Sequence, residues 1–238
     1  MFLITIIEKD NIFMKYLKRF NKIFDYEAFK GEGDYVTPHV CYINETKGVL
    51  FKPCTNHIIY YTSSDNNIII PYVTNVFGAN IVSNTYKDGQ GMIIFDRYVT
   101  SIGAWAFFWS QKLTSIIIPD SVTSIDDYAF YYCNNLINIT IPNIVTTIGF
   151  RAFSQCTNLT NITIPIKVTL IEDYAFEKCN SLTNIYCKPL IPPVLENTSV
   201  FDNNNEGRLI HVPTASVDIY KSATNWSTYG DYIVGHEF

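Results

Sequence analysis

The 238-residue chain has a formal net charge of −5, with 16% charged and 47% hydrophobic residues. This length and composition are typical of a globular protein with a sizeable buried core. The low content of lysine and arginine argues against nucleic acids or anionic membrane surfaces as partners, since these need clustered positive charge. No apolar run reaches the roughly 18 residues of a transmembrane helix, so we expect no membrane span.

The chain begins with a short apolar run, MFLITII, which Glu8, Lys9 and Asp10 follow. A signal peptide has a basic start, a longer apolar stretch and a cleavage site made of small residues. We therefore expect no recognisable signal peptide in this sequence.

Residues 1–55 are predicted to form an N-terminal module. Large apolar residues recur at every fourth position of 11–24, at Ile12, Tyr16, Phe20 and Phe24. This spacing predicts an amphipathic helix, which either docks on the rest of the domain or acts as an oligomerisation or membrane-surface helix. Residues 39–53 predict a β-hairpin that turns near Glu45–Gly48.

Two histidines and two cysteines flank this predicted hairpin: His39, Cys41, Cys54 and His57. Their spacing matches no common zinc signature, so we expect no metal site and no cofactor. Cys41 and Cys54 are expected to lie about 10 Å apart along the hairpin, which is beyond the reach of a disulfide.

Residues 99–190 contain four copies of one repeat and follow an N-cap segment at 56–98. The copies begin at Val99, Val122, Val145 and Val168, in steps of 23 residues (122−99). A period of this size with an L-x-x-I-x-I core is typical of leucine-rich repeats. Such repeats stack into a solenoid because no single coil buries its apolar face alone.

Each copy carries the same set of apolar positions. The Leu-x-x-Ile-x-Ile core predicts a short strand with one inward face, and the proline after it ends that strand. A second extended piece, Val-Thr-x-Ile, and an Ala-Phe pair in the return arm complete the set. A cysteine follows the arm at Cys133, Cys156 and Cys179. We expect it to be a small buried hydrophobe, with a disulfide as the alternative.

The pattern L-T-x-I-x-I-P-x-x-V-T-x-I-x-x-x-A-F-x-x-C in residues 99–190 resembles the BspA-like leucine-rich repeat family. The resemblance implies a mainly β fold with short helical turns. It would be a right-handed leucine-rich repeat solenoid of 23-residue repeats, with an N-terminal module and a C-terminal strand–helix cap. Residues 56–98 are similar to the segment that leads into such arrays. Residues 191–238 are similar to a degenerate last repeat followed by the cap.

The same resemblance implies a surface-exposed or secreted protein that binds matrix proteins, other cells or glycans, with no shared catalytic activity. The residues agree, because the sequence has no G-x-G-x-x-G, Walker, G-x-S-x-G or H-E-x-x-H motif. Its histidines, at positions 39, 57, 211 and 236, are scattered along the sequence. The pairs Asp126-Asp127 and Glu172-Asp173 are expected to cap turns, with acid–base chemistry as the alternative. We expect no enzyme.

The outward positions of the repeat strands predict a polar stripe on the solenoid, formed by Asn138, Thr140, Asn161, Thr163, Asn184 and Tyr186. Stacked asparagines either hydrogen-bond to one another as a ladder or offer their amides, with the hydroxyls, to a sugar or a peptide backbone.

Aromatic residues flank the buried Ala-Phe pair in the first two copies: Trp105, Phe108, Trp109, Tyr128, Tyr131 and Tyr132. The corresponding positions of the later copies are mostly polar. Either the residues before 99 pack over the first two coils, or these side chains form an exposed patch of the kind that marks an interaction site.

Together these features predict a non-catalytic binding or adhesion protein whose ligand is a protein or a glycan. Its predicted location is the cell surface or the extracellular medium. The alternative is a structural or host-recognition protein of a phage or a similar particle. The repeats specify a scaffold rather than a ligand or an oligomeric state.

Overall fold

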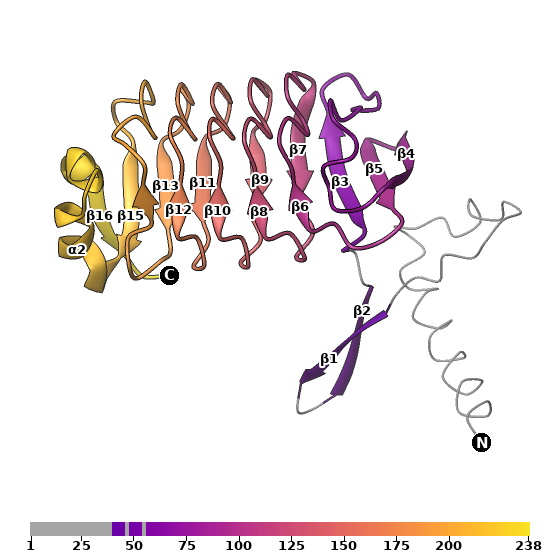
Figure 1. Ribbon diagram of the computed structural model, residues 1–238, viewed down its shortest axis with the longest axis horizontal. Coiled ribbons are helices and arrows are strands. Elements are labelled where there is room, and N and C mark those ends of the chain that lie inside the picture. The colour runs from indigo at the N-terminus through magenta and orange to yellow at the C-terminus, as the bar shows by residue number, and fades with distance from the viewer. Residues whose placement is uncertain (1–39, 46–47, 54–55) are drawn as a thin grey trace, which may run out of the picture. The chain divides into compact units, whose positions relative to one another are not determined.

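The computed structural model describes residues 40–45, 48–53 and 56–238, and the chain divides into two units after Pro53. In the first unit, strand β1 (Val40–Glu45) pairs antiparallel with β2 (Gly48–Pro53), and Glu45 lies opposite Gly48 (Figure 1). The hairpin predicted for 39–53 is confirmed. The helix predicted for 11–24 lies outside the described residues, as do His39 and Cys54 of the rejected zinc site.

The second unit opens with three antiparallel strands, β3 (Ile58–Ser63), β4 (Ile81–Lys87) and β5 (Gln90–Phe95). Asp88 and Gly89 join β4 to β5 with φ angles of 51° and 82°, as a type I′ turn requires. On its other side β3 pairs antiparallel with β7 (Leu113–Ile117), the strand of the first coil. The N-cap segment therefore covers the edge that the repeat stack would otherwise leave open.

The long strands of the coils line one side of the repeat array. β9 (Asn138–Thr140) pairs parallel with β7. β11 (Asn161–Ile164), β13 (Asn184–Cys187) and β15 (Leu209–Pro213) form a second parallel group. Ser115 lies opposite Asn138, and Asn161 lies opposite Asn184, so partners are 23 residues apart and the predicted period is confirmed.

Five two-residue strands form the other ladder of the coils. They are β6 (Ser101–Ile102), β8 (Ser124–Ile125), β10 (Thr147–Ile148), β12 (Leu170–Ile171) and β14 (Val194–Leu195), all parallel. The isoleucines predicted to be buried in this Val-Thr-x-Ile piece have no exposed surface: Ile102, Ile125, Ile148 and Ile171. The predicted mainly β leucine-rich repeat fold is confirmed, and Figure 1 shows the coils side by side.

A column of phenylalanines forms the centre of the core. Phe107, Phe130, Phe153, Phe176 and Phe201 are fully buried and stack in that order, with neighbouring ring centroids 5.2–5.6 Å apart. Each buried ring stabilises the fold by roughly 1.5–3 kcal/mol through area burial. Because each ring lies between the rings of its neighbours, the coils share one core. The column continues to Phe201, beyond the four copies of the 23-residue repeat.

The repeated cysteines are free and fully buried, as predicted. The thiol of Cys133 donates to the carbonyl of Phe107 at 3.1 Å, and Cys156 and Cys179 make the same bond to Phe130 and Phe153 at 3.2 Å. Burial raises the pKa of the Cys133 thiol to about 12. These cysteines therefore tie one coil to the preceding coil and form no disulfide.

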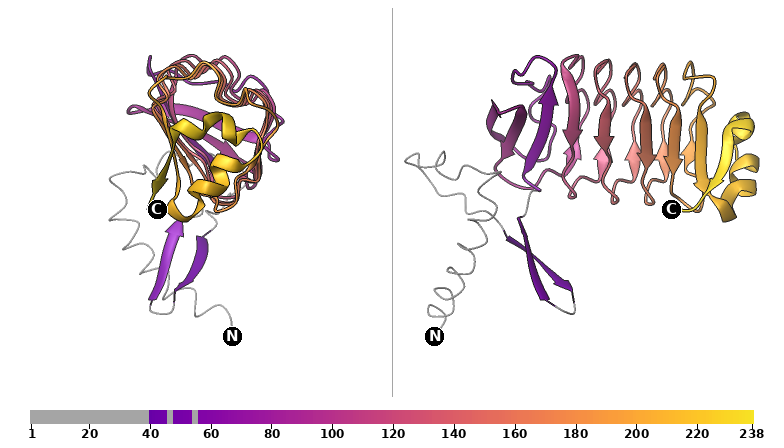
Figure 2. Two further views of the ribbon diagram at one scale, coloured as in Figure 1. Left: turned by 90° about the vertical axis from the view of Figure 1, so that its left-hand side faces the viewer. Right: turned by 180° about the vertical axis from the view of Figure 1, so that it is seen from behind.

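The predicted strand–helix cap closes the other end of the stack. After β15 come the turn η2 (Thr214–Ser216), helix α2 (Val217–Ser222), the 3-10 helix η3 (Trp226–Tyr232) and strand β16 (Ile233–His236). The buried Tyr220 and Trp226 donate to the carbonyls of Pro189 and Pro193 at 2.8 and 2.7 Å. Figure 2 shows α2 and η3 lying across the end of the coils. One element is additional to the prediction, because β16 returns and pairs parallel with β15.

Candidate functional site

The polar stripe lies on the outer face of the long strands. Asn138, Thr140 and Asn161 are exposed, whereas Thr163, Asn184 and Tyr186 are half-buried. The stripe carries amides and hydroxyls but no formal charge. At its N-terminal end it borders the exposed Ile117, which pairs with Thr140.

A short asparagine ladder forms in the second half of this stripe. The amide nitrogen Nδ2 of Asn184 donates to Oδ1 of Asn161 at 3.0 Å. Oδ1 of Asn184 lies 2.9 Å from Nε2 of His211 on β15. The same Nδ2 also donates to Oγ1 of Thr183 at 3.1 Å. Asn184 is therefore held from three sides, whereas Asn138 remains exposed.

The ladder ends in a cluster of rings that the sequence prediction missed. The ring of His211 stacks on Tyr186 with centroids 4.6 Å apart, and His236 lies 5.4 Å from both rings. The description of the histidines as scattered is therefore wrong for this pair. Tyr186, His211 and His236 are 25 residues apart in sequence, a spacing close to that of the repeat. Burial, and then the neighbouring His236, lower the pKa of His211.

The aromatic side chains of the first two coils stack in register on the return arm. Trp105 stacks on Tyr128 and Trp109 on Tyr132, with centroids 4.2 and 4.5 Å apart. Phe108 stacks on Tyr131 at 5.4 Å. Each tryptophan has a positive φ, 63° at residue 105 and 59° at residue 109, and the corresponding positions of all four coils do the same. The backbone of the arm is thus common to the coils, and only its side chains differ.

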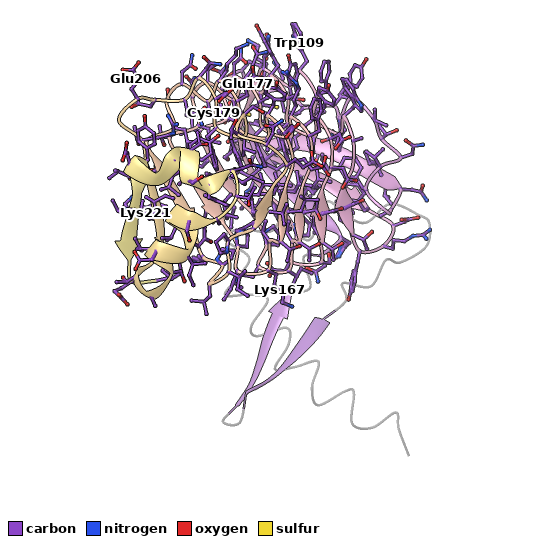
Figure 3. All side chains as sticks on the ribbon, turned by 60° about the vertical axis from the view of Figure 1, so that its left-hand side comes forward. Trp109, Lys167, Glu177, Cys179, Glu206 and Lys221 are labelled. Atoms are coloured by element: carbon purple, nitrogen blue, oxygen red, sulfur yellow. The ribbon has the colours of Figure 1, made fainter. Side chains whose placement is uncertain are left out.

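The N-cap segment covers part of this aromatic surface. The amide of Tyr72 donates to the carbonyl of Ala106 at 2.8 Å, and its ring packs on Phe108 with centroids 5.2 Å apart. Trp109 nevertheless keeps 54% of its surface exposed, and Tyr72 keeps 65%. Figure 3 shows Trp109 projecting from the tips of the coils. Packing by the N-cap and exposure to solvent therefore occur together.

A groove of about 660 Å³ lies beside this tryptophan. We call it the aromatic groove; its apolar lining is formed by Ile68, Ile69, Ile70, Tyr72, Phe108 and Trp109. Ser110, Gln111 and Lys112 provide the polar part of the lining. Ile70 is 75% exposed and also lines a second groove beside the first, together with Asn80 and Asn84.

The same arm positions form a polar network in the third and fourth coils. The buried Glu177 accepts hydrogen bonds from Arg151 at 2.7 Å and from Ser154 at 3.0 Å, and it lies 3.3 Å from Lys178. The guanidinium of Arg151 lies over the ring of Tyr174, 4.5 Å from its centroid. Oxygens and nitrogens on this part of the arm are therefore paired with one another.

The acidic pairs lie at turns, where they accept backbone hydrogen bonds. The amide of Phe150 donates to Oδ1 of Asp127 at 3.0 Å and to Oε2 of Glu172 at 3.1 Å. Burial, and then the charges of Asp127 and Glu196, raise the pKa of Glu172. Their contacts are those expected of turn caps. In the described part of the chain, histidine, cysteine and carboxylate side chains gather nowhere in groups of three or more that suit a metal ion.

Comparison with known families then assigns the repeats. Residues 80–207, more than half of the chain, match the family described as "BspA type Leucine rich repeat region" in six copies. The chain belongs to this family. The six copies extend the four 23-residue units on both sides, in line with the phenylalanine column that reaches Phe201.

Solved structures of the same type are similar to parts of the chain. A leucine rich cell surface protein from Faecalibacterium prausnitzii is 29% identical with a TM-score of 0.48, covering 54% of this chain and 33% of its own. The pneumococcal vaccine antigen PcpA is 17% identical with a TM-score of 0.42, covering 57% and 38%. A leucine-rich repeat protein from Bacteroides ovatus is 22% identical with a TM-score of 0.32, covering 76% and 55%.

The chain therefore spans from one third to about one half of the length of these structures. No curated protein matches the sequence. Among the helices of the described residues, none has the length and apolarity needed to cross a bilayer.

Proposed function

We propose that this protein is a non-catalytic adhesion or binding protein, located at the cell surface or secreted, whose ligand is a protein or a glycan. The proposed location rests on membership of the BspA-type family. The proposed activity rests on one observation, the exposed aromatic side chains around the aromatic groove.

Exposed tryptophan and tyrosine are costly on a surface that meets only water. Monomeric proteins bury most large apolar side chains, and the exposed patches that remain mark interaction sites. Tryptophan and tyrosine also dominate the binding energy of interfaces. Trp109, Tyr72 and Ile70 each expose more than half of their surface around one groove, and stacking on Tyr132 holds Trp109 in place. A rigid apolar anchor of this kind loses little side-chain entropy when it binds.

The polar stripe is the second candidate surface. Asn138 and Thr140 expose their amide and hydroxyl groups on a flat parallel sheet, which suits the hydroxyl groups of a sugar or a peptide backbone. Asn161 and Asn184 have part of their hydrogen-bonding capacity occupied by the ladder. We therefore rank the aromatic groove first.

The test is a binding screen of the full chain against immobilised matrix proteins, mucin and a glycan array. Any ligand found is then measured with two variants, Trp109→Ala and Lys178→Ala. Lys178 occupies the same arm position three coils later, with a φ of 56°, and is the matched control. We expect Trp109→Ala to weaken binding at least tenfold and Lys178→Ala to leave it unchanged. Loss of binding only in Asn138→Ala would assign the activity to the polar stripe instead.

A further inference from the structure

The ring cluster at the end of the asparagine ladder has a geometry that the proposed adhesive function does not use. His211 and His236 lie on the neighbouring parallel strands β15 and β16, on the outer face of the cap sheet. Both side chains are half-buried, so each retains an open side. Tyr186 stacks on His211 and thereby restricts its rotation.

Hydrogen bonding determines which nitrogen of His211 carries the proton. Nδ2 of Asn184 donates both to Oδ1 of Asn161 and to Oγ1 of Thr183, and these bonds fix the orientation of the Asn184 amide. Oδ1 of Asn184 therefore faces Nε2 of His211 and accepts a hydrogen bond from it at 2.9 Å. In neutral imidazole only one nitrogen is protonated, so Nδ1 of His211 carries a free lone pair. Histidines that bind metals have this same arrangement, with one nitrogen held by an oxygen and the other directed at the ion.

The second imidazole lies at a suitable distance. The ring centroids of His211 and His236 are 5.4 Å apart, with planes inclined by 70°. Two imidazoles that share a tetrahedral ion have centroids roughly 5 Å apart, because each metal–nitrogen bond is about 2.0–2.1 Å long. His236 makes no hydrogen bond to the described residues, and its ring contacts are with Tyr186, His211 and Phe238.

We propose that His211 and His236 form a two-histidine site for a late first-row transition metal ion such as Cu²⁺, Ni²⁺ or Zn²⁺, with water completing the coordination. Imidazole nitrogens suit these ions, and Cu²⁺ binds most tightly in the series. Asn184 is a positioning residue, which holds the tautomer of His211 without touching the ion. The proposal is separate from the adhesive function, and its test needs no ligand of the aromatic groove.

The test is a titration of the full chain, without an affinity tag, with Cu²⁺, followed by electron paramagnetic resonance and calorimetry. We expect one ion per chain and hyperfine structure from two nitrogen ligands. His211→Ala and His236→Ala should each weaken binding at least tenfold. Asn184→Ala should weaken it about 10–100-fold, as is typical when the partner of a metal-binding histidine is removed. His39→Ala is the matched histidine control and should bind like the unmodified chain.

Two results would overturn the proposal. One is the absence of Cu²⁺ binding by the unmodified chain at 100 μM ion, a concentration chosen for the assay on the order of weak micromolar to millimolar sites. The other is undiminished binding by the double variant of His211 and His236, which would place the ion elsewhere. Circular dichroism of every variant distinguishes lost ligands from lost folding.

Discussion

The return arm of the solenoid has one backbone and two kinds of surface. In the first two coils its outer positions are stacked aromatic rings, such as Trp109 on Tyr132. In the next two coils the corresponding positions hold a paired network centred on the buried Glu177 and Arg151. The φ angles are positive at the same positions in both halves. The repeat therefore determines the path of the chain, whereas the outer side chains determine whether a coil offers apolar area to a partner or pairs its polar groups internally.

The largest expected effect concerns what the two halves share, the phenylalanine column. Phe130→Ala in the aromatic half and Phe153→Ala in the polar half each remove a fully buried ring that lies between two others. Each should lower the free energy of unfolding by about 3–5 kcal/mol. Urea denaturation measures both variants. A difference of more than about 2 kcal/mol between them would contradict the idea of one common core.

The second effect belongs to the polar half alone. Arg151→Ala leaves the buried carboxylate of Glu177 with only Ser154 and Lys178 as partners, and should cost about 1–3 kcal/mol of unfolding free energy. Arg97→Ala is the control, because its ion pair with Asp96 is exposed and should contribute about 0.5 kcal/mol or less. Equal losses in the two variants would show that the network around Glu177 contributes no more than a surface ion pair.

A smaller effect compares the left-handed positions of the two halves. Lys178→Gly relieves a non-glycine residue at a φ of 56° and should raise the unfolding free energy by about 1 kcal/mol. Trp109→Gly gives the same relief but loses the stack on Tyr132, worth about 0.5–1.5 kcal/mol, so it should be nearly neutral. Thermal denaturation of the pair checks the expectation. Stabilisation by both substitutions would mean that the aromatic stack adds nothing.

The smallest effect is a pH dependence at the turn between the halves. The pKa of Glu172 is raised in the folded state by burial and by Asp127 and Glu196, so folding favours its protonated form. Stability should therefore fall as the pH rises from about 4.5 through the higher folded pKa. Glu172→Gln keeps an oxygen to accept the hydrogen bond from Phe150. It should melt at a higher temperature than the unmodified chain at pH 7, with the difference vanishing below about pH 4. The exposed Glu206→Gln serves as the control.

Repetition explains what the sequence predicted well. Residues 23 positions apart lie opposite each other in the ladders, so one unit predicted the buried isoleucines, phenylalanines and cysteines of the others. The polar stripe follows from the same rule. Non-repeated contacts were not predictable in this way. The segment around Tyr72 reaches Phe108 from outside the array, and Arg151 meets Glu177 from 26 positions away.

The histidine cluster was missed for a related reason. His211 lies opposite Tyr186 in the ladder, but β16 pairs Val234 with His211 and places His236 opposite Pro213. The strands of the cap thus depart from the 23-residue register, and a prediction that follows the repeat does not carry past β13. The recurrence of ring-bearing residues at 186, 211 and 236 was the available signal.

The most direct test of the account exchanges the two surfaces on the shared backbone. A variant with Trp105→Arg, Phe108→Ser and Trp109→Gln carries in coil one the residues found at the same positions of coil three. Its binding to the ligand found in the screen is measured beside its circular dichroism. The account predicts a folded protein whose binding is lost. A folded variant that binds with undiminished affinity would contradict it and show that the aromatic groove is not the contact surface.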